Sequence, residues 1–114
     1  MKQEGMQTHF KKGVTTLCIL SLLQRQEMYG YELVQQMSLR SERAFEMSQG
    51  SLYPFLHRLE AAGNLEAYSR QAEGRERVYY HLTKRGRAAL EEREQSWRFY
   101  VEAMEKILRG GTTE

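Results

Sequence analysis

The chain has 114 residues, of which 40% are hydrophobic and 28% are charged, enough for one domain with one modest core and too apolar for a disordered chain. Its longest apolar run, Leu17–Leu23, is interrupted by Ser21 and is too short to cross a bilayer, and we expect no signal peptide. The single cysteine, Cys18, cannot form an internal disulfide and lies in an apolar stretch. We therefore expect a cytoplasmic protein with an inert, buried thiol.

The distribution of charge is more informative than its total. The formal net charge is only +2, yet residues 66–90 hold six Lys or Arg residues against three Glu. A short basic segment of this kind suits contact with phosphate groups. On charge alone, however, an ordinary solvated surface is the more common explanation.

The segment Phe10–Gln24 is predicted to be a helix. Its apolar residues leave little polar circumference, so the helix must be covered on more than one side, and a second subunit would supply such a cover. The broad apolar face comprises Val14, Leu17, Cys18, Leu20 and Leu23, and Ile19 and Leu22 extend it.

Two further helices are expected before residue 63. One runs from about Tyr29 to Leu39, and after a polar connection the next ends near Ala62, where Gly63-Asn64 is a stop signal. Leu52, Leu56 and Leu59 form the buried line of this third helix. Its start has two alternatives. Pro54 in the first turn favours Ser51 as the N-cap, whereas an N-cap at Ser48 would put Pro54 later in the helix.

The period then changes to that of strands. Leu65–Gln71 and Arg77–Leu82 are predicted to be two short strands joined by a turn at Gly74. On the second strand, Val78, Tyr80 and Leu82 should point to one side, and Arg77, Tyr79 and His81 to the other.

Thr83 is the expected N-cap of a long final helix, Lys84–Arg109, which Gly110-Gly111 ends. Along it, an apolar line repeats every seven residues, as in a helix that packs against another helix. We therefore expect it to dimerise. The predicted dimer interface comprises Leu17, Leu90, Trp97, Val101, Met104 and Leu108.

Three helices, a basic hairpin and a long helix are the order of a winged helix-turn-helix with a C-terminal dimerisation helix. The expected fold is thus mainly α with a small β-hairpin. We divide it into a DNA-binding domain (1–83), a dimerisation helix (84–109) and a tail (110–114). In such a fold the third helix enters the DNA major groove and the hairpin, or wing, lies along the backbone or minor groove.

The residues opposite the buried line of the third helix suit DNA. Ser and Gln read base edges, whereas Tyr and Arg hold phosphates. Two blander interpretations stay open: Tyr53 packing at the helix turn, and Arg75 and Arg77 as solvated hairpin charges. The predicted DNA contacts are Gln49, Ser51, Tyr53, His57 and Arg58 of the third helix and Arg70, Arg75 and Arg77 of the hairpin.

The sequence resembles the PadR family of transcriptional regulators, in its short single-domain form, from about Phe10 to Leu108. The matching stretches are Phe10-Lys11-Lys12-Gly13, Tyr29-Gly30-Tyr31-Glu32-Leu33, Gly50-Ser51-Leu52-Tyr53-Pro54-Phe55-Leu56-His57-Arg58-Leu59-Glu60, Gly63, and Tyr79-Tyr80-His81-Leu82-Thr83-Lys84-Arg85-Gly86. The Leu-Tyr-Pro stretch, its Arg-Leu-Glu continuation and the later Leu-Thr are specific in this combination.

The resemblance implies a homodimeric repressor of nearby genes. The helix-helix-helix-hairpin order with its basic segment predicts that a dimer binds a pseudo-palindromic operator in double-stranded DNA. The resemblance also implies that the C-terminal helix packs against the first helix of the partner. In some short members of the family a flat aromatic or drug-like compound binds at that interface between paired tryptophans. Trp97 lies where that tryptophan falls in the pattern, so the resemblance implies an effector site at Trp97 and Tyr100. The heptad position of Trp97 favours the alternative that it is only a dimer-core anchor.

Other classes of function have less support. The chain has no Asp, no nucleophile elbow and no phosphate-binding glycine loop, so we expect no enzyme and no cofactor. His9, His57 and His81 lack metal-ligand spacing, so we expect no metal site. The main rival is a winged-helix module that binds other proteins and never DNA, because a fold does not determine a function.

Overall fold

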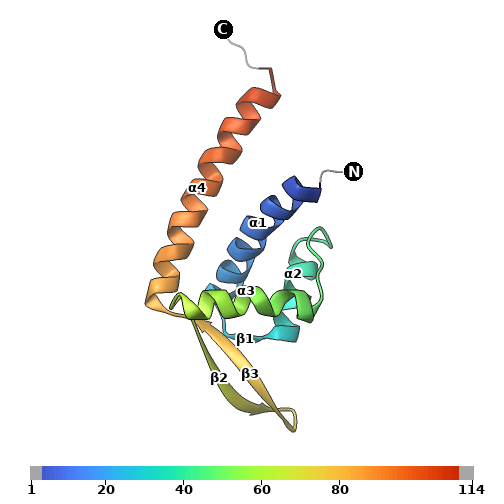
Figure 1. The fold of residues 1–114 in the computed structure, drawn as a ribbon, viewed down its shortest axis with the longest axis vertical. Coiled ribbons are helices and arrows are strands. Elements are labelled where there is room, and N and C mark those ends of the chain that lie inside the picture. Colours follow the sequence, from blue (N-terminus) through green and yellow to red (C-terminus); the bar gives the residue numbers. More distant parts are fainter. Residues whose placement is uncertain (1–3, 111–114) are drawn as a thin grey trace.

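The structure is a computed structural model that describes the backbone of residues 4–110 and the side chains from Lys12 onward; of the expected tail, 111–114 lie outside the described residues. The described residues form four helices and a small antiparallel sheet (Figure 1). The elements are α1 (Glu4–Arg25), β1 (Met28–Tyr29), α2 (Gly30–Arg40), α3 (Gln49–Ala61), β2 (Leu65–Ala72), β3 (Arg75–Leu82) and α4 (Lys84–Leu108).

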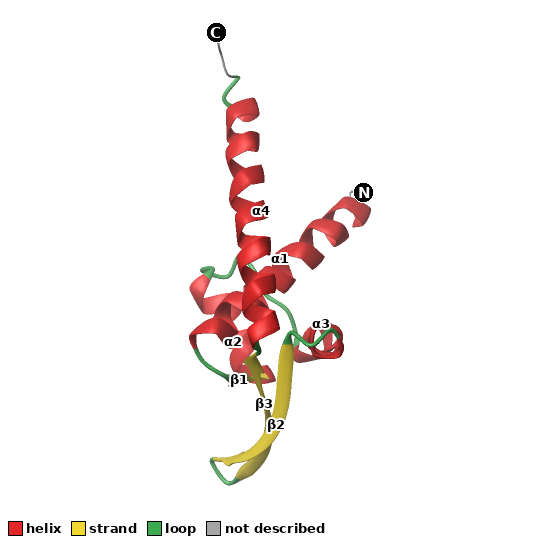
Figure 2. Cartoon of the chain, turned by 90° about the vertical axis from the view of Figure 1, so that its left-hand side faces the viewer, coloured by secondary structure: helices red, strands yellow, loops and turns green. Residues whose placement is uncertain are grey.

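The molecule has two projections. The hairpin of β2 and β3 extends from one end of the helical body, and α4 extends from the other (Figures 1 and 2). Antiparallel helices α1 and α4 pack together at the base of α4 and splay apart toward its C-terminus (Figure 2). The expected winged helix-turn-helix with a long last helix is confirmed.

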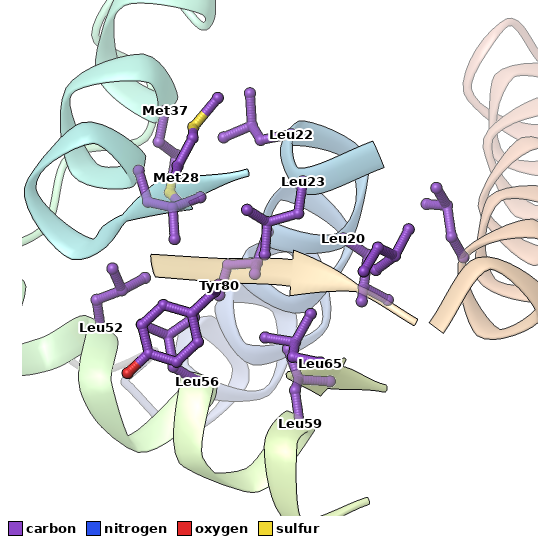
Figure 3. Close-up of a cluster of buried hydrophobic side chains, with 14 residues drawn as sticks. Leu20, Leu22, Leu23, Met28, Met37, Leu52, Leu56, Leu59, Leu65 and Tyr80 are labelled. Carbon is purple, nitrogen blue, oxygen red and sulfur yellow. The ribbon is translucent and has the colours of Figure 1, made fainter. Parts of the chain in front are cut away.

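The core lies where α1, α2, α3 and the sheet meet, and Figure 3 shows its side chains. The predicted line of Leu52, Leu56 and Leu59 is buried on the inner face of α3. Tyr80 of β3 enters the core beside Leu52 and Leu56 (Figure 3). The buried face that the apolar spacing predicted for the third helix is therefore confirmed.

Helix α3 begins one turn earlier than the favoured alternative. Ser48 is its N-cap, and its Oγ accepts a hydrogen bond from Ser51 N at 3.1 Å. Ser51 is therefore inside the helix, and the prediction that it caps the helix is wrong. Pro54 lies in the second turn, where the N–H it lacks leaves the Gly50 carbonyl without its helical donor. Gly50 is exposed, so water can satisfy that carbonyl.

The hairpin is longer than predicted because its turn is only two residues. Glu73 and Gly74 both have positive φ, at 54° and 76°, as in the tight turns that match the twist of paired strands. Pairing therefore continues to Ala72 and Arg75.

Strand β1 was not predicted. Its two residues, Met28 and Tyr29, pair with Tyr80 and Tyr79 of β3, so that β3 lies in the centre of the sheet. Two residues are too few for an alternating pattern. The partner strand that defines β1 lies some fifty residues later in the chain, so local sequence gives no signal for it.

Two expectations about apolar surface are corrected. The apolar circumference of α1 is covered largely by the protomer itself, from α2, β3 and α4, and so it does not require a second subunit. Leu90, expected in the dimer interface, is 2% exposed and belongs to the protomer's own core.

Cys18 is half-buried rather than fully buried, and burial raises the pKa of its thiol. None of the helices within the described residues is long and apolar enough to span a membrane.

Candidate nucleic-acid interface

The outer face of α3 carries most of the polar side chains that we expected to read DNA. Ser51, His57 and Arg58 are exposed on the side away from the buried leucine line, and Gln49 is exposed as the first residue of the helix. The Arg58 guanidinium lies 4.9 Å from the centre of the Phe55 ring, which orients the side chain without removing it from solvent. An exposed polar face that includes the oriented guanidinium of Arg58 can contact both base edges and phosphates.

Tyr53 has a different place from its neighbours on α3. It is half-buried, stacks on His57 with the ring centres 6.0 Å apart, and its hydroxyl donates to Gln49 Oε1 at 3.4 Å. A Cβ atom on Gly30 would lie 2.9 Å from that hydroxyl oxygen. Tyr53 thus fills the space that Gly30 leaves at the start of α2, and it contacts both Gln49 and His57 on the outer side of α3.

The N-terminal turn of α3 holds a small hydroxyl network. Ser48 Oγ donates to Ser51 Oγ at 3.1 Å, while it accepts from Ser51 N. The hydroxyl proton of Ser51 is then free to point outward and donate to an acceptor on a ligand. The same turn presents helix N–H groups, which attract phosphate.

The three hairpin arginines, each predicted to contact DNA, occupy different environments. Arg75 is exposed beside the turn, at the outer end of the wing. Arg70 and Arg77 face each other across the two strands, farther in. Arg70 is bonded to Glu27 at 2.7 Å, and the side chain of Arg77 is only 20% exposed. Arg70 is exposed as well, but of the three only Arg75 forms no ion pair with another described residue, which leaves its charge for a phosphate.

Arg85, at the start of α4, is placed by a contact that the sequence did not indicate. A cation in the first turn of a helix is disfavoured by the helix dipole. Arg85 Nη1, however, donates to the carbonyl of Ala62 at 3.3 Å, at the C-terminal end of α3. The charge therefore lies at a helix terminus that favours it.

The second candidate site is a groove between α1 and α4. It has a volume of about 640 Å³. The groove brings together Leu17 of α1 with Trp97 and Tyr100 of α4, which are 42% and 64% exposed. Val101, Met104 and Leu108, expected at the dimer interface, are exposed farther along α4. This groove is formed within one protomer, whereas the resemblance implied a site against the partner's first helix.

Residues 19–92 match the model of the transcriptional regulator PadR-like family. The chain belongs to this family. It is 41% identical over 83 residues to a transcriptional regulator from Mycobacterium tuberculosis, an alignment that covers 73% of this chain and 75% of the relative.

Solved PadR structures agree with the fold. A PadR-like transcriptional regulator from Bacillus cereus is 35% identical, with a TM-score of 0.78 and coverage of 88% of this chain and 96% of the other. A PadR family regulator from Clostridium difficile is 33% identical, with a TM-score of 0.73 and coverage of 82% and 97%. These findings confirm the resemblance, the winged-helix fold and a regulatory rather than enzymatic class.

The PadR match has an informative boundary. It spans the core of the winged helix and the base of α4, but ends before Trp97. The groove and the exposed apolar half of α4 therefore lie mostly in the part of this PadR-like chain that the family model does not reach.

Proposed function

We propose that the chain is a homodimeric transcriptional repressor that binds a pseudo-palindromic operator through α3 and the wing, and that a small planar aromatic effector releases it. The observation that carries the proposal is spatial. The exposed polar face of α3 and Arg75 on the wing belong to the two elements that a winged helix presents to DNA. The exposed apolar half of α4 projects from the opposite end (Figure 1).

Within this proposal, α3 enters the major groove with Gln49 and Ser51 near its N-terminal end, toward the bases. His57 and Arg58 flank them toward the backbone, and Arg75 contacts phosphate from the wing. Tyr53 acts through its contacts with Gln49 and His57. A dimer would place two such units on half-sites about one helical turn or more apart.

The test starts with DNA that the purified chain selects from fragmented genomic DNA, followed by anisotropy titrations at several salt concentrations. Arg75→Ala should weaken binding to all sequences and reduce the salt slope by about one unit. Gln49→Ala and Ser51→Ala should change which sequence is preferred. If all three variants affect every sequence equally, α3 does not read bases. If none affects binding and no salt dependence is found, the chain is a protein-interaction module instead.

The pattern of exposed side chains on α4 supports the dimer. At 100° per residue, Trp97, Val101, Met104 and Leu108 form one apolar stripe. Tyr100 and Ile107 form a second stripe with Ala103, on the side of the groove. A helix with two apolar stripes needs two different neighbours. Within the protomer, α1 covers only one of these stripes, and only at the base of α4. A second copy of the chain would cover the remaining apolar surface.

The groove supports the effector. A volume of about 640 Å³ is in the range of small-molecule sites, and its apolar side chains and ring faces suit a flat aromatic compound. The effector would act by favouring one angle of α4, since a ligand shifts an equilibrium only by binding its two states differently. Repression itself is tested with a reporter gene behind the selected operator. Its expression should fall when the chain is supplied and recover when the effector is added.

A further inference from the structure

The wing carries a ladder of alternating tyrosine and arginine side chains on one face of the sheet. The Arg70 guanidinium carbon lies 4.0 Å from the centre of the Tyr79 ring, and that of Arg77 lies 4.3 Å from the centre of the Tyr29 ring. Tyr79 in turn contacts Tyr29 edge to face and stacks on Tyr68, with ring centres 5.3 and 6.1 Å apart. Each positive charge therefore lies over an aromatic face.

Glu27 joins this ladder to the helical body. It lies in the short connection between α1 and β1, and its Oε2 accepts a hydrogen bond from Arg70 Nη1 at 2.7 Å. The Tyr68 hydroxyl and then Arg70 lower the pKa of the Glu27 carboxyl, so the group is ionised at neutral pH. One carboxylate at the end of α1 thus holds two side chains of β2.

The ladder accounts for an arrangement that is otherwise unfavourable. Arg70 and Arg77 are directly opposite in the strand register, and like charges in that position destabilise a strand pair. Arg77 Nε is buried and finds no hydrogen-bond acceptor among the described residues, a further cost. Tyr29, Tyr79 and Glu27 offset these costs, together with Glu73, whose Oε1 lies 3.8 Å from Arg77 Nη2, and the two guanidinium groups are thereby held against the protein.

We propose that Glu27 and this tyrosine–arginine ladder hold the wing at the angle that DNA binding requires, so that Glu27, Arg70 and Arg77 are positioning residues and Arg75 is the phosphate contact of the wing. This inference rests on the DNA binding proposed above. It assigns a favourable role to Glu27, an acidic residue close to a surface that would bind a polyanion. A simple electrostatic account would predict only that this carboxylate weakens DNA binding.

The sign of one substitution separates the two accounts. Glu27→Gln removes a negative charge from the wing and frees Arg70, so electrostatics alone predicts tighter DNA binding and a steeper salt slope. If Glu27 positions the wing, Glu27→Gln instead weakens binding about two- to fivefold, the range of a partly exposed ion pair, and does not steepen the slope. The matched control is Glu76→Gln. It removes the same charge from an exposed site on β3, outside the ladder, and should tighten binding.

A second variant tests Arg70 directly. Arg70→Lys retains the charge but loses the planar group that lies on Tyr79 and bonds Glu27. A positioning role predicts that Arg70→Lys weakens binding as much as Glu27→Gln, that the double variant adds little, and that the salt slope stays unchanged. Arg75→Ala should reduce the slope by about one unit. A reduced slope for Arg70→Ala, with binding fully retained in Arg70→Lys, would overturn the assignment of Arg70.

The experiment uses anisotropy titrations with a labelled duplex that the protein has selected, together with amide hydrogen exchange without DNA. Exchange in residues 69–78 should be faster in Glu27→Gln than in the unmodified chain, while the amides of α1 and α3 stay protected. Unchanged exchange in the wing, or tighter DNA binding by Glu27→Gln, overturns the proposal. If instead no form of the chain binds DNA but exchange in the wing is faster in Glu27→Gln, the proposed function fails, while the role of Glu27 and the ladder in holding the wing is retained.

Discussion

The backbone of Gly86, in the first turn of α4, lies so close to the carbonyl of Asn64 that a Cβ atom would be 2.2 Å from its oxygen. Thr83 completes the junction, since its N donates to Asn64 O at 3.1 Å and its Oγ1 donates to Gly63 O at 2.7 Å. The turn that ends α3 is therefore bonded to the N-terminus of α4. We expect a rotation of α4 to be transmitted to the C-terminal end of α3.

Gly86→Ala should destabilise the fold, because the new methyl group meets backbone atoms that cannot move aside independently. We expect a loss of about 1–3 kcal/mol in the free energy of unfolding, measured by urea denaturation. Gly50→Ala is the control, since its Cβ would meet only Ser48 Oγ, at an ordinary 3.8 Å. Equal stability of the Gly86→Ala protein would show that the junction yields without cost.

The turn between α2 and α3 is strained at two successive residues. Glu42 and Arg43 have φ values of 53° and 73°, in a region that side chains with a Cβ disfavour. Arg43→Gly should therefore be more stable than Arg43→Ala by about 1 kcal/mol. Both variants lose the exposed ion pair with Glu46, so their difference in urea midpoint isolates the strain. No difference would mean that the backbone relaxes in both.

The apolar stripes of α4 predict assembly. Met104→Glu and Leu108→Glu should break the dimer and also destabilise the chain, because large apolar surfaces would then meet water. Lys106→Glu, on the polar side of the same helix, should leave assembly intact. Analytical ultracentrifugation distinguishes these outcomes. A well-folded monomer of the unmodified chain at millimolar concentration would contradict the dimer.

Trp97, the one tryptophan of the chain, reports on the groove. Planar aromatic compounds should quench its fluorescence and reduce operator affinity. The Trp97→Ala protein should still bind the operator but no longer respond to the compound. If a screen leaves the fluorescence unchanged, or if Trp97→Ala abolishes the dimer, then Trp97 is an interface anchor and not an effector contact.

Local patterns were sufficient for most of the elements, with β1 and the start of α3 as exceptions. The spacing of Leu52, Leu56 and Leu59 predicted the buried face of α3, and Thr83 was correctly predicted to cap α4. Gly74 marked the turn of the wing. These features depend on residues within one or two turns of each other, and so the sequence carries them directly. The family resemblance added the class of the protein.

What the sequence by itself determined is therefore the type and order of the helices and of the hairpin, and the side chains that form the buried line of α3. Only the tertiary structure decided what covers each side chain. Leu90 has the heptad spacing of an interface residue but faces the protomer's own core, and Arg70 and Arg77 have the composition of phosphate contacts but lie on Tyr79 and Tyr29. Periodicity predicts that a side chain is buried, but it does not show which segment or subunit covers it. Contacts between distant segments depend on strand register and helix packing, which no local pattern encodes.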